Sequence, residues 1–170
     1  MSARAPAVDI VLQSPLWKQR PQAEAAIRTA IAAAARAVPG KALAASAREL
    51  SVVLTDDDAI RALNRQWRGI DKPTNVLSFP AATAPARDGS RHSPLGDIVV
   101  AYETLARECA EERKDFLHHL SHLTVHGFLH LLGYDHANDS EADDMERLES
   151  AILARLDVPD PYLARDTGQD

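Results

Sequence analysis

Histidines are concentrated in one short stretch of this chain. Six of the seven lie between His118 and His136. His126 and His130 are four residues apart, so on a helix their side chains project from one face, one turn apart. Gly133 then ends the helical pattern and lets the chain turn back, so that His136 can supply a third imidazole. Three histidines with a fourth position open to water are typical of a catalytic zinc site.

Spacing alone leaves another pairing of these histidines open. His122 continues the same stripe, and a pair formed by His122 and His126 is also geometrically possible. We favour His126 with His130, because only this pair is followed by a turn that delivers a third ligand. His122 then faces the substrate or supports a ligand, whereas His118 and His119 have no predicted role.

A zinc-protease pattern shares this histidine spacing. The extended motif H-E-x-x-H-x-x-G-x-x-H matches the chain from His126 to His136, including the glycine at Gly133. The glutamate that acts as general base in such proteases falls on Gly127, which has no side chain to move a proton. A zinc metalloprotease-like hydrolase is therefore an alternative rather than the first hypothesis.

A basic stripe precedes the histidines in the chain. Arg61, Arg65, Arg68 and Lys72 recur every three or four residues and would share one helix face. Arg68 differs from the others because it lies at the expected end of the helix, where its guanidinium can be held in place and can bind phosphate oxygens with two hydrogen bonds. With a net charge of −6, the chain can bind a polyanion only through a local basic patch or a metal ion.

Strands and helices are expected to alternate along the chain. Strands are predicted at residues 8–12, 49–54, 75–79 and 97–101, and helices at 21–38, 56–68, 103–113, 115–132 and 140–156. Capping boxes of Thr55 with Asp58 and of Ser140 with Asp143 would open two of these helices. The third and fourth strands are joined only by a loop, so we expect a mixed sheet of about four strands packed against helices, an α+β fold. The 115–132 segment is apolar nearly all round, as in a buried central helix that carries the histidines.

Composition and length agree with a single domain over residues 1–170. The chain is 45% hydrophobic and 26% charged, which is typical of globular proteins, and its one cysteine excludes an internal disulfide framework. Residues 81–94 are expected to form a flexible surface loop, and residues 157–170 a polar tail. No apolar run reaches the roughly 18 residues of a membrane helix, and no secretory signal is recognisable. We therefore expect a soluble, cytoplasmic protein.

Three segments together resemble one known family. LNRQWRGIDKPTNVLSFP (63–80), LGDIVV (95–100) and HGFLHLLGYDH (126–136) occur in the order found in the YbeY family of bacterial endoribonucleases. The resemblance implies a zincin-like α+β fold. It also implies a metal-dependent, single-strand-specific endoribonuclease that matures the 3′ end of small-subunit ribosomal RNA and takes part in ribosome quality control.

The same resemblance implies the residues of the site and the partners. Three motif histidines that bind one zinc ion map onto His126, His130 and His136, and an essential arginine maps onto Arg68. Lys72 can add a phosphate contact. The implied partners are single-stranded ribosomal RNA, the small ribosomal subunit and its assembly proteins, with no membrane.

Two mechanistic questions stay open at this level, the role of the metal and the identity of the general base, which Gly127 cannot be. The metal either polarises a phosphoryl oxygen or supplies hydroxide, while Arg68 binds the phosphate and its developing charge. A non-catalytic ribosome-assembly factor with a structural zinc is a further alternative. That alternative needs a fourth protein ligand, such as His122 or Asp135.

Overall fold

A four-stranded sheet forms the centre of the protein. The structure is a computed structural model that describes residues 6–39, 49–81, 95–135 and 137–162. The strands are β1 (Ala7–Leu12), β2 (Glu49–Thr55), β3 (Val76–Pro80) and β4 (Gly96–Ala101), in the order β1-β2-β4-β3. β1, β2 and β4 are parallel, and β3 runs antiparallel to β4. The predicted mixed sheet and α+β class are confirmed, since β3 and β4 are consecutive in the chain and adjacent in the sheet.

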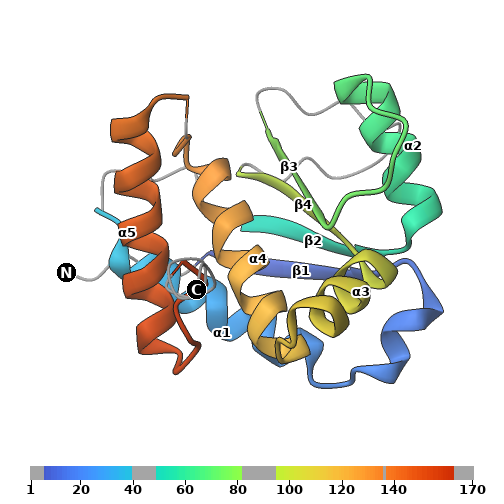
Figure 1. The fold of residues 1–170 in the computed structure, drawn as a ribbon, viewed down its shortest axis with the longest axis horizontal. Helices are drawn as coiled ribbons and strands as arrows, with labels where there is room; N and C mark the ends of the chain where they lie inside the picture. Colours follow the sequence, from blue (N-terminus) through green and yellow to red (C-terminus); the bar gives the residue numbers. More distant parts are fainter. Residues whose placement is uncertain (1–5, 40–48, 82–94, 136, 163–170) are drawn as a thin grey trace.

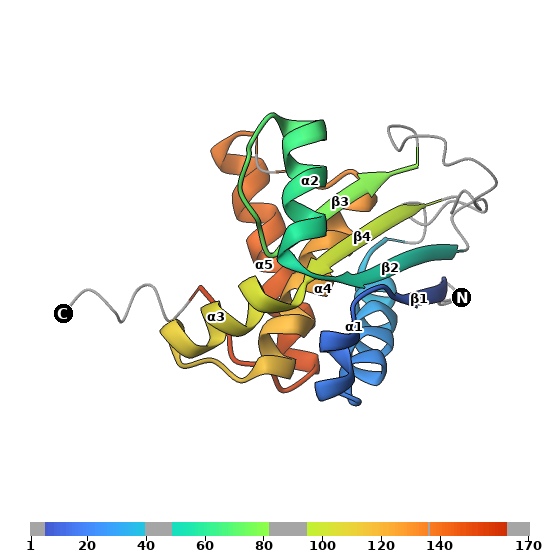
Figure 2. The same cartoon turned by 90° about the vertical axis from the view of Figure 1, so that its right-hand side faces the viewer.

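Helices cover both faces of this sheet (Figures 1 and 2). They are the short 3-10 helix η1 (Pro15–Gln19), α1 (Ala23–Ala37), α2 (Asp57–Arg68), α3 (Tyr102–Glu112), α4 (Phe116–Leu131) and α5 (Asp139–Arg155). α2 packs on one face. α1 and α4 pack on the other face, and α5 contacts both of them.

Each face of the sheet has its own hydrophobic core. Successive side chains of a strand point to opposite faces. On β4, Val99 and Ala101 accordingly join the smaller core beneath α2, whereas Ile98 and Val100 join the larger core beneath α1 and α4. The continuous apolar run of β4 therefore supplies both cores at once, and Ile98 and Val100 help to hold α4 against the sheet.

α4 is buried along most of its length, as its apolar sequence predicts. Its first turn is capped by Asp115, whose side chain accepts a hydrogen bond from the backbone N of His118 at 3.0 Å. Past its end, Gly133 adopts φ +96°, a conformation that favours glycine, and the chain turns away there. The histidine pair thus lies near the end of a helix that is fixed on several sides.

Two helix starts differ from the sequence prediction. Asp56, not Thr55, caps α2, because Thr55 is the last residue of β2 and pairs with Ala101 in the sheet. Asn138, not Ser140, caps α5, and the helix begins earlier than expected. In both places the residue that caps is Asp or Asn, whose short side chains accept hydrogen bonds from the first helical turn.

The expected loop and tail are described only in part. The loop at 82–94 and the tail beyond residue 162 lie outside the described residues. The described part of the tail is not simply polar and exposed, since Val158 is buried in the larger core. Across the described ranges, none of the helices combines the length and the apolar character that crossing a membrane requires.

Candidate active site

A cavity of about 920 Å³ lies between the edge strand β3 and helix α4. Its walls come from the end of α2, from β3 and the turn before it, from α4, and from the C-terminal segment. Arg68, His126 and His130 all line this cavity. The fold therefore brings the predicted arginine to the same cavity as two of the predicted metal ligands.

The two histidines point their ring nitrogens at one place. Nε2 of His130 lies 2.9 Å from Nε2 of His126, and the ring centroids are 4.4 Å apart. Two imidazoles that hold one ion need this convergence, and imidazole nitrogens are donors that suit zinc. The pair therefore fits a zinc-type cation. The third predicted ligand, His136, lies outside the described residues.

A buried carboxylate contacts this pair from the side away from His130. Glu149 of α5 is 0% exposed. Its Oε1 lies 2.7 Å from Nδ1 of His126, and its Oε2 lies 3.1 Å from Nε2 of His122. The hydroxyl of Tyr162 donates to Oε2 at 2.7 Å. Burial alone would raise the pKa of this carboxyl, but the hydrogen bonds from His122, His126 and Tyr162 outweigh burial and lower it to about 2.

Glu149 was not among the predicted site residues, although the sequence carries a signal for it. The buried residues of α5 are Met145, Glu149, Ile152 and Leu153, which follow helical spacing. A carboxylate in such a stripe costs free energy unless it finds partners, so its presence predicts a buried polar contact. The stripe therefore indicates that Glu149 has a buried polar partner, but it does not indicate that the partner is His126.

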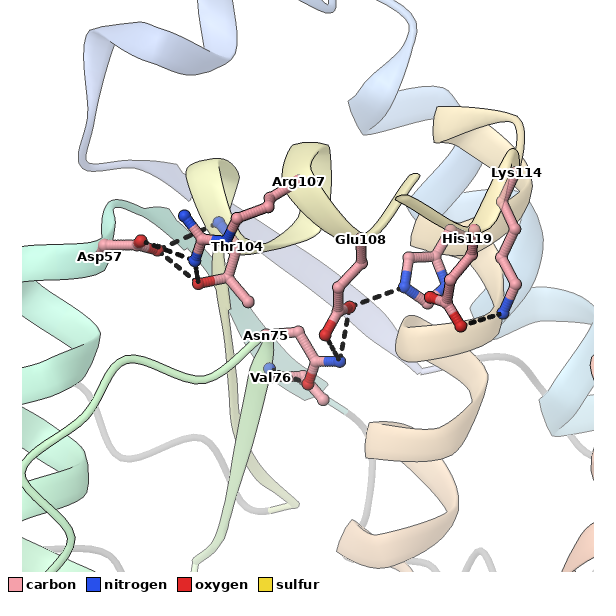
Figure 3. A network of polar contacts seen from close by, with 9 residues as sticks. Asp57, Asn75, Val76, Thr104, Arg107, Glu108, Lys114 and His119 are labelled. Carbon is pink, nitrogen blue, oxygen red and sulfur yellow. Dashed lines mark hydrogen bonds and ion pairs between the residues drawn. The ribbon is translucent and has the colours of Figure 1, made fainter. Parts of the chain in front are cut away.

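A second group of possible ligands lies on α3 and α4 (Figure 3). Glu108, Glu112 and His119 each offer one ligand atom, and these atoms lie within 4.8 Å of one another, so the group could hold a metal ion. Glu108 lies 2.8 Å from Nε2 of His119 and also accepts from Asn75 at 2.9 Å. Nζ of Lys114 lies 3.6 Å from Glu112. These contacts already satisfy much of the charge of the group.

The expectation that His119 has no role is wrong. Its side chain is only 6% exposed and joins α4 to Glu108 of α3. Burial raises the pKa of Glu108, but the hydrogen bonds from His119 and Asn75 lower it by more, so it ends below its ordinary value. His119 therefore has a structural contact that its position in the histidine stripe does not reveal.

The residues of the predicted basic stripe lie in different environments, and not all of them reach the cavity. Arg61 forms an ion pair with Asp71 at 2.9 Å. Lys72 is exposed in the turn after α2 and is not among the residues that line the cavity. Lys114, which the sequence analysis did not single out, lines the cavity instead. The cations at the cavity wall, within the described ranges, are therefore Arg68 and Lys114.

Gly127 packs against the sheet, beside a residue of β3 that lines the cavity. A Cβ added there would lie 3.1 Å from Cγ2 of Ile98 and 3.1 Å from Oγ of Ser78. The Ser78 hydroxyl also donates to the carbonyl oxygen of Gly127 at 3.3 Å. A glutamate at the position of the protease base would therefore meet β3 and β4, which weakens the metalloprotease alternative.

An α+β fold in which a buried central helix presents a histidine pair to an open cavity is an arrangement suited to a metal-dependent hydrolase. The family model described as endoribonuclease YbeY matches residues 16–157. The chain therefore belongs to the endoribonuclease YbeY family.

Similar proteins cover nearly the whole chain. Endoribonuclease YbeY of Bradyrhizobium sp. strain BTAi1 is 55% identical over 163 residues, which is 95% of each chain. That of Rhodopseudomonas palustris strain BisA53 is 53% identical over 170 residues, covering 98% of this chain and 95% of the other. The solution structure of TM1509 from Thermotoga maritima covers 88% of this chain and 91% of its own, with a TM-score of 0.49 and 22% identity.

Proposed function

We propose that this protein is a cytoplasmic, zinc-dependent endoribonuclease that cleaves single-stranded RNA. Its place is ribosomal RNA processing, including maturation of the 3′ end of small-subunit RNA, and ribosome quality control. The observation that carries the proposal is that Arg68 lines one cavity with the pair of His126 and His130. Membership in the endoribonuclease YbeY family supports RNA as the substrate.

One zinc ion would be held by His126 and His130, with His136 as the third ligand. The convergence of the two Nε2 atoms supports this assignment. When bound, such an ion acts as a Lewis acid and lowers the pKa of a coordinated water to about 7. Three protein ligands leave a position for that water, which is what a catalytic site needs and a structural site lacks.

Arg68 would bind the scissile phosphate. It is the last residue of α2, and Gly69 with φ 70° ends the helix immediately after it. A guanidinium at the cavity wall can donate two parallel hydrogen bonds to phosphate oxygens and stabilise the charge that develops there. Lys114 adds a second positive charge at the wall. Lys72 is exposed and lies outside the cavity, so it would contact a phosphate of the RNA farther from the scissile one.

The ligand assignment is tested by His130→Ala. Two remaining imidazoles hold a divalent ion far more weakly than three, so we expect most bound zinc to be lost and RNA cleavage to stop. Metal analysis and a gel assay with a labelled single-stranded RNA measure both effects. His118→Ala is the control, because His118 lies on the same helix but does not line this cavity.

Three outcomes would contradict parts of the proposal. Stoichiometric zinc in His130→Ala would mean that the ligands are wrongly assigned. Equal cleavage of the same RNA in a duplex would contradict the single-strand preference. A zinc-loaded wild-type protein that binds ribosomal RNA without cleaving it would favour a non-catalytic assembly factor.

A further inference from the structure

The contacts of Glu149 constrain which nitrogen of His126 carries a proton. An ionised carboxylate can only accept hydrogen bonds. Because Oε1 of Glu149 lies 2.7 Å from Nδ1 of His126, that nitrogen must be the donor. The neutral ring then has its lone pair on Nε2, the atom that faces His130. This is the tautomer in which His126 can bind a metal through Nε2.

The same carboxylate also occupies His122. Nε2 of His122 lies 3.1 Å from Oε2 of Glu149 and must donate to it. Nδ1 of His122 is buried and has no hydrogen-bond partner among the described residues. His122 therefore contributes to this site through Glu149, and its Nε2 is not available as a further ligand.

The C-terminal segment completes the surroundings of Glu149. The hydroxyl of Tyr162 donates to Oε2 at 2.7 Å, and its ring packs edge-on against His122 with centroids 6.0 Å apart. The backbone N of Tyr162 donates to the Asp160 side chain at 2.8 Å, which shapes the turn that brings it there. Glu149 thus accepts three hydrogen bonds, two from α4 and one from the segment after α5.

We propose that Glu149 is a positioning residue that fixes the ring orientation and tautomer of His126, and that Tyr162 links the C-terminal segment to this function. The inference rests on the proposed metal site. Carboxylates that hold the far nitrogen of a metal-binding histidine typically contribute a factor of about 10 to 100 to metal affinity. Here one carboxylate orients His126, His122 and Tyr162 together.

The direct test is the tautomer of His126 in the metal-free protein, read from the nitrogen chemical shifts of ¹⁵N-histidine. The wild type should show His126 protonated at Nδ1 and His122 protonated at Nε2. Glu149→Gln keeps the side-chain volume but replaces one acceptor oxygen with an NH₂ donor. We expect it to give a mixture of His126 tautomers and a zinc affinity about 10 to 100 times weaker in a chelator competition.

Two further variants separate positioning from general stability. Glu141→Gln changes an exposed carboxylate on the same helix and should leave zinc affinity unchanged. Tyr162→Phe removes one hydrogen bond to Glu149 and leaves the carboxylate in place, so we expect a loss of zinc affinity of a few fold. It also provides the test if Glu149→Gln does not fold.

The inference is overturned if metal-free wild-type His126 is protonated at Nε2. It is also overturned if folded Glu149→Gln, or Tyr162→Phe in its place, binds zinc as tightly as the wild type. Neither readout uses RNA. A protein whose zinc affinity depends on Glu149 but which cleaves no RNA would therefore refute the proposed function and support this inference.

Discussion

At the residue scale, the proposed contribution of Arg68 depends on the shape of its guanidinium as well as on its charge. Arg68→Lys keeps the charge but loses the pair of parallel hydrogen bonds. We expect the cleavage rate to fall by about a hundredfold or more. Zinc content and stability should not change, because Arg68 is exposed and is not a proposed ligand.

Steady-state kinetics on a single-stranded RNA measure this effect. Arg65→Lys is a matched control, since Arg65 is exposed on the same helix and does not line the cavity. It should retain the wild-type rate. Wild-type cleavage by Arg68→Lys would show that the guanidinium does not stabilise charge in the transition state.

Local spacing predicts some of these residues and cannot predict others. A separation of four residues places His126 and His130 on one helix face whatever the rest of the fold is. Glu149 and Lys114 join the site only because α5 and the turn before α4 pack beside it, and no local pattern encodes that packing. His119 is misjudged for the same reason, since its partner lies on another helix.

At the scale of elements, Glu108 connects α3 to α4 and to the residue before β3 (Figure 3). Its pKa in the folded protein lies below the ordinary value of 4.5. A carboxyl whose pKa is lowered by folding stabilises the protein above its unfolded pKa, and this stabilisation is lost as the pH falls through the folded pKa. Glu108→Gln should therefore lower the free energy of unfolding by about 1 kcal/mol near neutral pH.

The difference between Glu108→Gln and the wild type should begin to shrink as the pH falls below about 4.5, where the carboxyl of the unfolded chain takes up a proton. Its charge-dependent part should be lost once the pH has fallen through the lower pKa of the folded protein. Urea unfolding at several pH values between neutral and acid measures it. Glu111→Gln changes an exposed carboxylate of the same helix and serves as the control. A difference that stays constant with pH would mean that the charge of Glu108 does not contribute.

Most elements could be predicted because their residues carry local signals. The short apolar runs of the four strands, which are β-branched in β1 and β4, and the loop expected between the last two predict the mixed sheet. The 3-10 helix η1 begins with a local signal, Ser14 as its cap followed by a proline, but the contacts of its tryptophan are distant ones that no local pattern predicts. Its Trp17 is 2% exposed, and its Nε1 donates to the carbonyl oxygen of Thr55 at 2.8 Å. Its ring also packs against Tyr102 and Phe116.

At the scale of the whole molecule, the two cores consist of apolar side chains on both faces of one sheet. We therefore expect metal removal with a chelator to stop RNA cleavage and to leave the protein folded. Proteins that fold only with their metal unfold when the metal is removed, because their hydrophobic cores are too small to keep them folded without it. Far-UV circular dichroism and urea unfolding before and after chelation measure this, and we expect one cooperative transition of a single domain in both states.

Adding zinc back should restore cleavage, which controls for damage by the chelator. Loss of helical signal on chelation would mean that the ion is structural. Two separate unfolding transitions would contradict a single domain.

Cys109 lies on α3, one residue after Glu108, and is the single cysteine of the chain. It is buried, and burial raises the pKa of its thiol to about 11. At neutral pH very little of this thiol is ionised, and the thiolate is the form that alkylating reagents attack. We therefore expect the native protein to be alkylated slowly, at a rate that depends on how often α3 separates from its neighbours. The alkylation rate of Cys109 would therefore report local opening of α3, the helix that carries Glu108.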